Sequence, residues 1–94
     1  MVVIRNRQVD KRGMFYVGQD GAVLAELVYH IGPKGELVID HTEVDDSLSG
    51  KGIGEQLVET AVEYARTHQM KIRVLCPFAK KIFSKRPEWN DLLL

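Results

Sequence analysis

A glycine-rich stretch separates two halves of this 94-residue chain with different hydrophobic periods, and it reads Ser49-Gly50-Lys51-Gly52-Ile53-Gly54. Before it, short apolar runs alternate with Gly and Pro, which is typical of strands joined by turns. After it, apolar residues recur at the spacing of one helical face. These residues are Ile53, Leu57, Val58, Ala61, Val62 and Ala65. The stretch therefore marks the point where a strand ends and a long helix begins.

The first half predicts an antiparallel meander of four strands, because turn residues such as Asp20-Gly21 and Gly32-Pro33 separate its apolar runs. We expect these strands at residues 2–7, 14–17, 22–31 and 36–44. The second half predicts a helix, a strand, a short helix that Pro87 ends and a tail that Trp89 pins to the core. We expect these at residues 52–68, 71–75, 78–85 and 88–94.

A strand–helix–strand crossover makes the fourth and fifth strands parallel neighbours. The fold class is therefore α+β over one domain, residues 1–94. We expect a mixed, mostly antiparallel sheet with one long helix after the fourth strand and a short C-terminal helix.

Size and charge restrict the classes of function. The formal net charge is zero, so no global field attracts nucleic acid or an anionic membrane. The single cysteine, Cys76, rules out an intrachain disulfide, and the apolar run 22–31 is too short to span a bilayer. Residues 1–10 lack the apolar stretch of a signal peptide. We expect a cytoplasmic chain without a membrane contact, as a monomer or weak dimer.

Two distributions of polar residues bear on ligands. Three scattered histidines and one cysteine lack the spacing of a zinc signature, so the sequence predicts no metal site. Residues 71–87 carry six basic side chains and no acidic one. This basic run is either a solvated face or a local anion site.

The glycine-rich stretch has the chemistry of a pyrophosphate cradle. Glycines let backbone N–H groups approach a ligand closely, and the first amides of a helix lack intrahelical acceptors and carry partial positive charge. A flexible turn before the helix is the alternative interpretation. Gly52 and Gly54 cost roughly 1 kcal/mol each inside a helix, which favours a ligand that needs close approach.

Two common phosphate motifs do not fit. The P-loop needs four residues between its glycines, followed by Gly-Lys-Ser/Thr. The dinucleotide motif needs a glycine three residues after Gly52, where Glu55 stands, and a first strand in a parallel sheet. Spacing and topology exclude both.

The stretch resembles the acyl-CoA signature of the GNAT superfamily, Gln/Arg-x-x-Gly-x-Gly/Ala, with Gly52 and Gly54 at the glycine positions and Ser49 in place of Gln or Arg. More of the chain resembles the short stand-alone GNAT-like N-acetyltransferases of the YjdJ type. The segments that carry this likeness are residues 39–44, the loop to Gly54, Leu75-Cys76-Pro77-Phe78 and Arg86-Pro87-Glu88-Trp89.

The resemblance implies that acetyl-CoA is the co-substrate and a primary amine is the acceptor. In GNAT proteins the strand before the loop diverges from its neighbour and pairs with pantetheine as an added strand would. By position, backbone groups of Glu43 and Val44 would meet pantetheine. The loop amides that would meet pyrophosphate belong to Gly50, Lys51, Gly52, Ile53 and Gly54. Lys80, with Lys81 and Lys85, could serve the 3′-phosphate, or these lysines form a solvated helix face.

Two residues are candidates for catalysis. His41 can accept a proton from an amine near pH 7, or it packs at a strand end. Asp40 and Glu43 are alternative bases or contacts for a cationic substrate; strand alternation predicts His41 and Glu43 on one face and Asp40 and Thr42 on the other. The resembling family carries a cysteine at the place of Cys76. It would act near the thioester if its thiol is activated, or it is a buried structural thiol.

Three functions remain open from the sequence. The first is an N-acetyltransferase that uses acetyl-CoA. The second is a non-catalytic acyl-CoA-binding or regulatory module. The third is a nucleic-acid-binding domain that uses the basic run 71–86. It is disfavoured because the net charge is zero and because the run lacks regularly spaced aromatic residues that bases could stack on.

Overall fold

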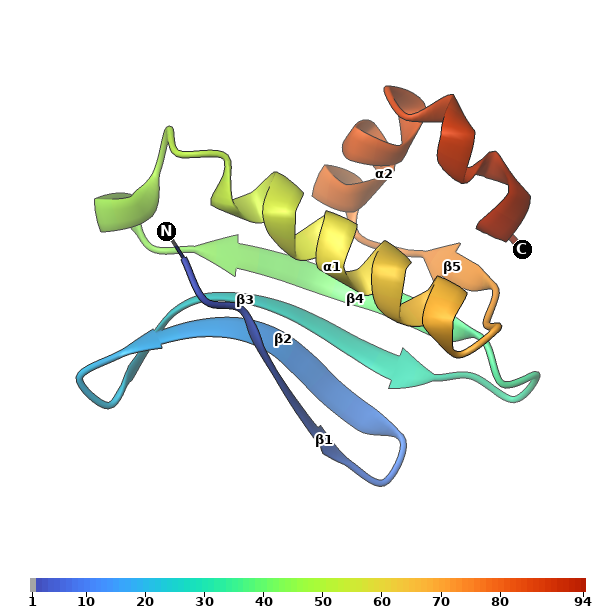
Figure 1. Ribbon diagram of the computed structural model, residues 1–94, viewed down its shortest axis with the longest axis horizontal. Helices are drawn as coiled ribbons and strands as arrows, with labels where there is room; N and C mark the ends of the chain where they lie inside the picture. Colours follow the sequence, from blue (N-terminus) through green and yellow to red (C-terminus); the bar gives the residue numbers. More distant parts are fainter. Residues whose placement is uncertain (1) are drawn as a thin grey trace.

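Five strands form one sheet in the order β1-β2-β3-β4-β5, and the helices follow the fourth and fifth strands (Figure 1). The computed structural model describes residues 2–94. All neighbouring strands are antiparallel except β4 and β5, which are parallel as the crossover predicts. The elements are β1 Arg5–Val9, β2 Arg12–Gln19, β3 Ala22–Ile31, β4 Leu37–Val44, η1 Asp46–Leu48, α1 Ile53–Thr67, β5 Ile72–Val74, α2 Pro77–Ser84 and η2 Pro87–Leu92.

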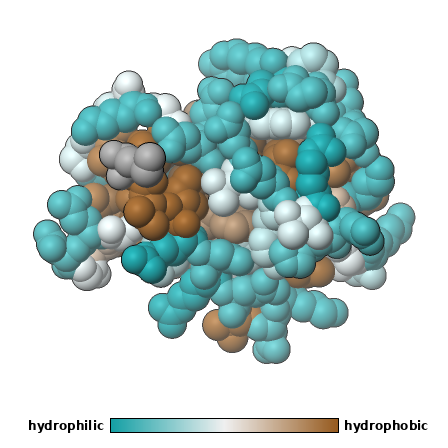
Figure 2. Space-filling view, viewed as in Figure 1, coloured by the Kyte–Doolittle hydropathy of each residue, from teal (hydrophilic) through white to brown (hydrophobic). Residues whose placement is uncertain are grey.

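One face of the sheet holds the core. The helix α1 packs across β2, β3 and β4, and α2 packs against β4, β5 and α1 (Figure 1). The predicted apolar stripe of α1 is buried, and it meets fully buried side chains of the sheet such as Leu27, Tyr29 and Ile39. In Figure 2, hydrophilic side chains cover most of the face that carries α1, and apolar ones surface in a few patches. In residues 2–94 no helix has the length and apolar character to cross a membrane.

The strand boundaries differ most from the prediction at the first hairpin. β1 is exposed along its whole length, so hydrogen bonding to β2 rather than burial sets its ends. The two strands pair from Arg5 with Tyr16 to Val9 with Arg12. Asp10 turns the chain with a φ of 55°, a conformation that Asp tolerates better than most residues. Neither turn residue, Asp10 or Lys11, is a glycine that would mark this turn in the sequence.

The C-terminal tail is more ordered than the sequence predicts. Residues Pro87–Leu92 form a 3₁₀ helix, η2, in which Trp89 and Leu92 are buried. The Arg86 guanidinium lies 4.2 Å from the centre of the Trp89 ring and forms ion pairs with Glu55 and Glu59 of α1. Trp89 therefore holds the tail to the core as expected, and Arg86 ties it to α1.

A β-bulge at Asp40 interrupts the alternation of β4. Val28 of β3 pairs with His41, whereas the next residue, Tyr29, pairs with Ile39, so Asp40 is an extra residue. The Asp40 carboxylate accepts a hydrogen bond from His30 Nδ1 at 2.8 Å, on the face away from the core. The prediction that Asp40 and Thr42 share a face is therefore wrong, because the bulge resets the two-residue period between them.

The turn between β3 and β4 is built around the buried carboxylate of Glu36. The Lys34 amide donates to Glu36 Oε1 at 2.8 Å, and Arg73 Nε lies 3.6 Å from Oε2. Hydrogen bonds from backbone N–H groups, first that of Glu36 and also that of Lys34, hold the pKa of Glu36 below its ordinary value, with help from Arg73 and against desolvation. The ionised form is thus stabilised by folding.

We expect Glu36→Gln to lower the midpoint of thermal unfolding at pH 7, because the carboxylate loses its charge-assisted hydrogen bonds. Since the pKa is lower in the folded state, this contribution is present above the unfolded pKa and is lost as pH falls through the folded pKa. The difference between variant and wild type should therefore shrink below about pH 4. Glu63→Gln, on the exposed side of α1, is the control. An equal difference at both pH values would contradict this account.

Candidate functional site

The strands β4 and β5 separate after three paired residues. β5 pairs with β4 only from Leu37–Ile72 to Ile39–Val74. The amides of Leu75 and Cys76 then both donate to the Ile39 carbonyl, at 3.0 and 3.2 Å, and α2 begins at the next residue. β4 continues to Val44 with β3 on one side and, among residues 2–94, no strand on the other (Figure 1). Beyond Ile39, β4 therefore has a free edge.

The pattern of hydrogen bonds decides which residues present their backbone at this free edge. The Asp45 amide donates to the Leu24 carbonyl of the β3 side at 2.7 Å. Alternate residues of an antiparallel strand direct their backbone groups to the partner strand. The backbone groups of Glu43 therefore also point to β3, and those of Thr42 and Val44 point to the free edge. Val44, which the resemblance places next to pantetheine, presents its backbone at this edge, and its contact with pantetheine stays a prediction. The alternation favours the backbone of Thr42 over that of Glu43 as the second group that could pair with a ligand at this edge.

The glycine-rich loop leads from η1 into α1, and its glycines have two separate structural causes. Gly50 and Gly52 adopt φ values of 77° and 72°, and an added Cβ would meet nothing at either position. These two glycines are required by backbone conformation. At Gly54 an added Cβ would lie 2.7 Å from the Phe78 ring, so this glycine allows α2 to pack closely on α1.

The amides at the start of α1 lack acceptors. Gly52 is the N-cap and provides no side-chain cap, and the first helical bond runs from the Gln56 amide to the Gly52 carbonyl at 3.1 Å. Within residues 2–94, the amides from Gly50 to Glu55 donate no hydrogen bond. Lys51 is exposed beside them. Unpaired amides and the helix dipole favour an anion here.

Cys76 lies on the helix side of the separated strands. It is the N-cap of α2 and is 3% exposed. Its Sγ lies 3.5 Å from Thr42 Oγ1. The thiol therefore contacts β4 at Thr42, whose backbone groups point to the free edge. In the described part of the chain, no basic side chain of residues 71–81 forms a hydrogen bond with the Cys76 thiol.

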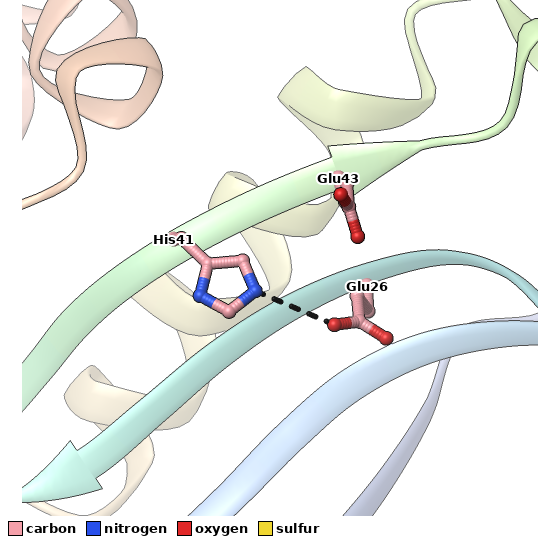
Figure 3. Close-up of side chains that lie close together, drawn as sticks. All are labelled: Glu26, His41 and Glu43. Carbon is pink, nitrogen blue, oxygen red and sulfur yellow. Dashed lines mark ion pairs between the residues drawn. The ribbon is translucent and has the colours of Figure 1, made fainter.

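His41 lies on the opposite face of β4 from Cys76, together with Glu43 and with Glu26 of β3 (Figure 3). His41 Nε2 is 3.5 Å from Glu26 Oε2. One ligand-type atom from each of the three side chains lies within 4.8 Å of the others. We call these three residues the open-face cluster. The structure joins His41 to Glu43, as the alternation predicts, and does not join His41 to Cys76.

Glu26 was not selected from the sequence, although a signal existed. β3 and β4 were both predicted, and Glu26 pairs directly with Glu43 in the observed register. The register depends on the bulge at Asp40, which no local pattern marks. Without knowledge of the bulge, the residue opposite Glu43 could not be identified from the sequence.

Lys80 lies on α2 and is exposed. It borders a hollow formed with β5 and the C-terminal residues, including Arg73, Asn90 and Leu94, in which no residue of the loop takes part. Lys81 follows Phe78 by three residues, so it lies on the helical side that faces α1. The contact of Lys80 with the cofactor stays a prediction, and Lys81, on the side of α2 next to Phe78, is a candidate for the same contact.

The separated strands next to an uncapped, glycine-rich helix N-terminus define a GNAT fold. The sequence family described as GCN5-related N-acetyl-transferase matches residues 14–92, and the chain belongs to this family. The narrower resemblance to the YjdJ type stays a prediction.

Several known proteins are similar to this chain over most of its length. Protein NATD1 of Xenopus tropicalis is 29% identical over 85 residues, which cover 89% of this chain and 78% of that protein. Protein NATD1 of Gallus gallus is 30% identical, with coverage of 82% and 71%. The solution structure of a "GCN5-like putative N-acetyltransferase" from Staphylococcus aureus has a TM-score of 0.73 and 36% identity, and covers 96% of this chain and 87% of that one.

A ribosomal-protein-alanine N-acetyltransferase from Brucella melitensis biovar Abortus 2308 has a TM-score of 0.65 at 19% identity, with coverage of 81% and 61%. At this identity it supports the fold alone.

The two causes of the loop glycines can be separated by mutation. We expect Gly54→Ala to lower the free energy of unfolding by about 1–3 kcal/mol, because the new methyl group overlaps the Phe78 ring. In a Phe78→Ala background the same change should be stabilising by up to about 1 kcal/mol, since alanine favours the helix. Urea denaturation of the four proteins in the cycle measures both values. The same effect in both backgrounds would contradict the packing role of Gly54.

Proposed function

We propose that this chain binds acetyl-CoA and transfers its acetyl group to a primary amine. The observation that supports this most is the free edge of β4 beyond Ile39, which continues into a helix start whose amides lack acceptors. A pantetheine arm is an extended chain of amides that can pair with such an edge, and a diphosphate suits such a helix start. Membership of the acetyltransferase family supports the same reading.

The proposed cofactor contacts follow from these two features. Backbone groups of Thr42 and Val44 pair with pantetheine, and the amides of Gly50, Lys51, Gly52, Ile53 and Gly54 bind the pyrophosphate. The Lys51 side chain adds positive charge. Lys81 rather than Lys80 is the proposed partner of the 3′-phosphate.

In the proposed transfer the amine nitrogen attacks the thioester carbonyl, and the carbonyl oxygen becomes an oxyanion. A backbone N–H near Val44 stabilises this oxyanion. The intermediate then expels CoA as a thiolate and leaves the amide. His41, directly or through a water, accepts the proton that the amine nitrogen loses. The Cys76 thiol, on the other face of β4, shields the departing sulfur or donates a proton to it.

A non-catalytic acyl-CoA-binding module is the second candidate function. The observation that favours it is the exposure of the acceptor side, where His41 is more than half exposed and no helix of residues 2–94 covers the sheet. Release of CoA in the presence of amines separates the candidates. The cytoplasmic location and the monomeric or weakly dimeric state stay predictions.

We expect Lys51→Glu to raise the dissociation constant of acetyl-CoA at least tenfold, about 1.4 kcal/mol, because a carboxylate would then repel the diphosphate. Lys51 is exposed, so the variant should fold. Lys11→Glu makes the same charge change in the β1–β2 turn and should bind like wild type. Isothermal titration calorimetry provides the constants. No binding of acetyl-CoA by wild type at millimolar concentration would overturn the proposed function.

We expect Cys76→Ala to bind acetyl-CoA like wild type and to release CoA more slowly in the presence of primary amines. The thiol lies at the sulfur side of the proposed site, where it shares a hydrogen bond with Thr42 of β4. Cys76→Ser, which keeps a hydrogen-bond donor to the departing sulfur, should be slowed less. Turnover of Cys76→Ala at the wild-type rate would limit the thiol to packing.

A further inference from the structure

The open-face cluster has a donor set that differs from the rest of the exposed acidic surface. It combines one imidazole, His41, with two carboxylates, Glu26 and Glu43, on two paired strands (Figure 3). Imidazole nitrogen and carboxylate oxygen together are ligands of Zn²⁺ and related divalent metals, whereas Mg²⁺ and Ca²⁺ prefer oxygen alone. The chemistry of the three side chains therefore selects a class of ion.

The spacing of the donor atoms suits such an ion. Two ligands bound at 2.0–2.1 Å to a tetrahedral metal lie about 3.3 Å apart. His41 Nε2 and Glu26 Oε2 are already 3.5 Å apart. The Glu43 carboxylate lies within 4.8 Å of both, and Glu43 is exposed. A rotation of this one side chain would bring the third ligand into range, with no change in the strands.

The pairing of β3 with β4 leaves a repulsion that a cation would relieve. Glu26 and Glu43 are directly opposite each other in the register, and like charges at such a position are destabilising. Asp45 and Asp46 line the adjoining hollow with them and increase the negative potential. His41 reaches only Glu26, so within residues 2–94 no ion pair neutralises Glu43.

We propose that Glu26, His41 and Glu43 bind a divalent transition metal of the Zn²⁺ class on the open face of the sheet, with a fourth coordination position open to solvent. This site is separate from the glycine-rich loop and does not depend on acetyl-CoA. A metal bound to His41 Nε2 would occupy the lone pair that accepts the amine proton in the proposed transfer. His41 therefore cannot be a metal ligand and a proton acceptor at the same time.

The test titrates Zn²⁺ into the chelator-treated full chain without acetyl-CoA and follows the heat of binding. We expect one ion per chain, with a dissociation constant in the micromolar range. His41→Gln and Glu43→Gln should each weaken binding at least tenfold. The matched control is His30→Gln, because His30 forms the other histidine–carboxylate pair of this face, with Asp40, and has no second carboxylate assigned to it. Circular dichroism verifies that each variant folds.

Three outcomes would overturn the site. The first is the absence of Zn²⁺ binding below millimolar concentration. The second is binding that Cys76→Ser abolishes and His41→Gln leaves unchanged, which would assign the ion to the thiol. The third is equal binding of Mg²⁺ or spermidine, unaffected by His41→Gln, which would reveal only a negative surface. Since no arm uses acetyl-CoA, these results are independent of whether the chain transfers acetyl groups.

Discussion

The carbonyl oxygen of Ile39 accepts two amide hydrogens, from Leu75 and Cys76, and this double contact ends the pairing of β4 with β5. After it the fifth strand turns into α2, while β4 continues alone on that side. The free edge, the position of Cys76 beside Thr42 and the approach of Phe78 to Gly54 all follow from that turn. Without it, a longer parallel pair would occupy the edge of β4 that is proposed to bind pantetheine.

The bulge at Asp40 divides the chemistry of β4 between the two faces. It lets Ile39 and Thr42 both lie on the helix side although they are three residues apart. Asp40, His41 and Glu43 are thereby collected on the open face. The fold thus places the buried thiol on the helix face of the sheet, beside the free edge of β4, and the titratable side chains on the open face. An acyl donor and an acceptor that approach from opposite faces would each meet the groups suited to them.

Much of the fold could be predicted because its determinants are local. The stripe from Ile53 to Ala65 specifies α1, and the turn residues Gly21 and Gly32–Gly35 specify the hairpins around β3. The crossover rule then makes β4 and β5 parallel. The turn at Asp10 and the helical tail were missed because hydrogen bonding and tertiary packing, rather than a hydrophobic pattern, produce them.

The candidate site was predictable only in part. The glycine-rich loop could be recognised, although Gly54 has a packing role that depends on Phe78, which is distant in sequence. To choose Thr42 over Glu43, one must know which residues of β4 direct their hydrogen-bonding groups to β3. To find Glu26, one must know the register of β3 and β4. A bulge that no sequence pattern indicates sets both. Lys80, a candidate for the 3′-phosphate, borders a hollow with Arg73, Asn90 and Leu94 that no local sequence pattern indicates.

The central claim is that backbone amides along the β4 edge and at the start of α1 receive an extended, diphosphate-bearing ligand. Amide chemical shifts in ¹⁵N-labelled protein, recorded during a titration with acetyl-CoA, test this residue by residue. The account predicts the largest changes at Thr42, Val44 and the amides from Gly50 to Glu55, with small changes in β1. Changes centred on the hollow beside Lys80, or none at the start of α1, would contradict it.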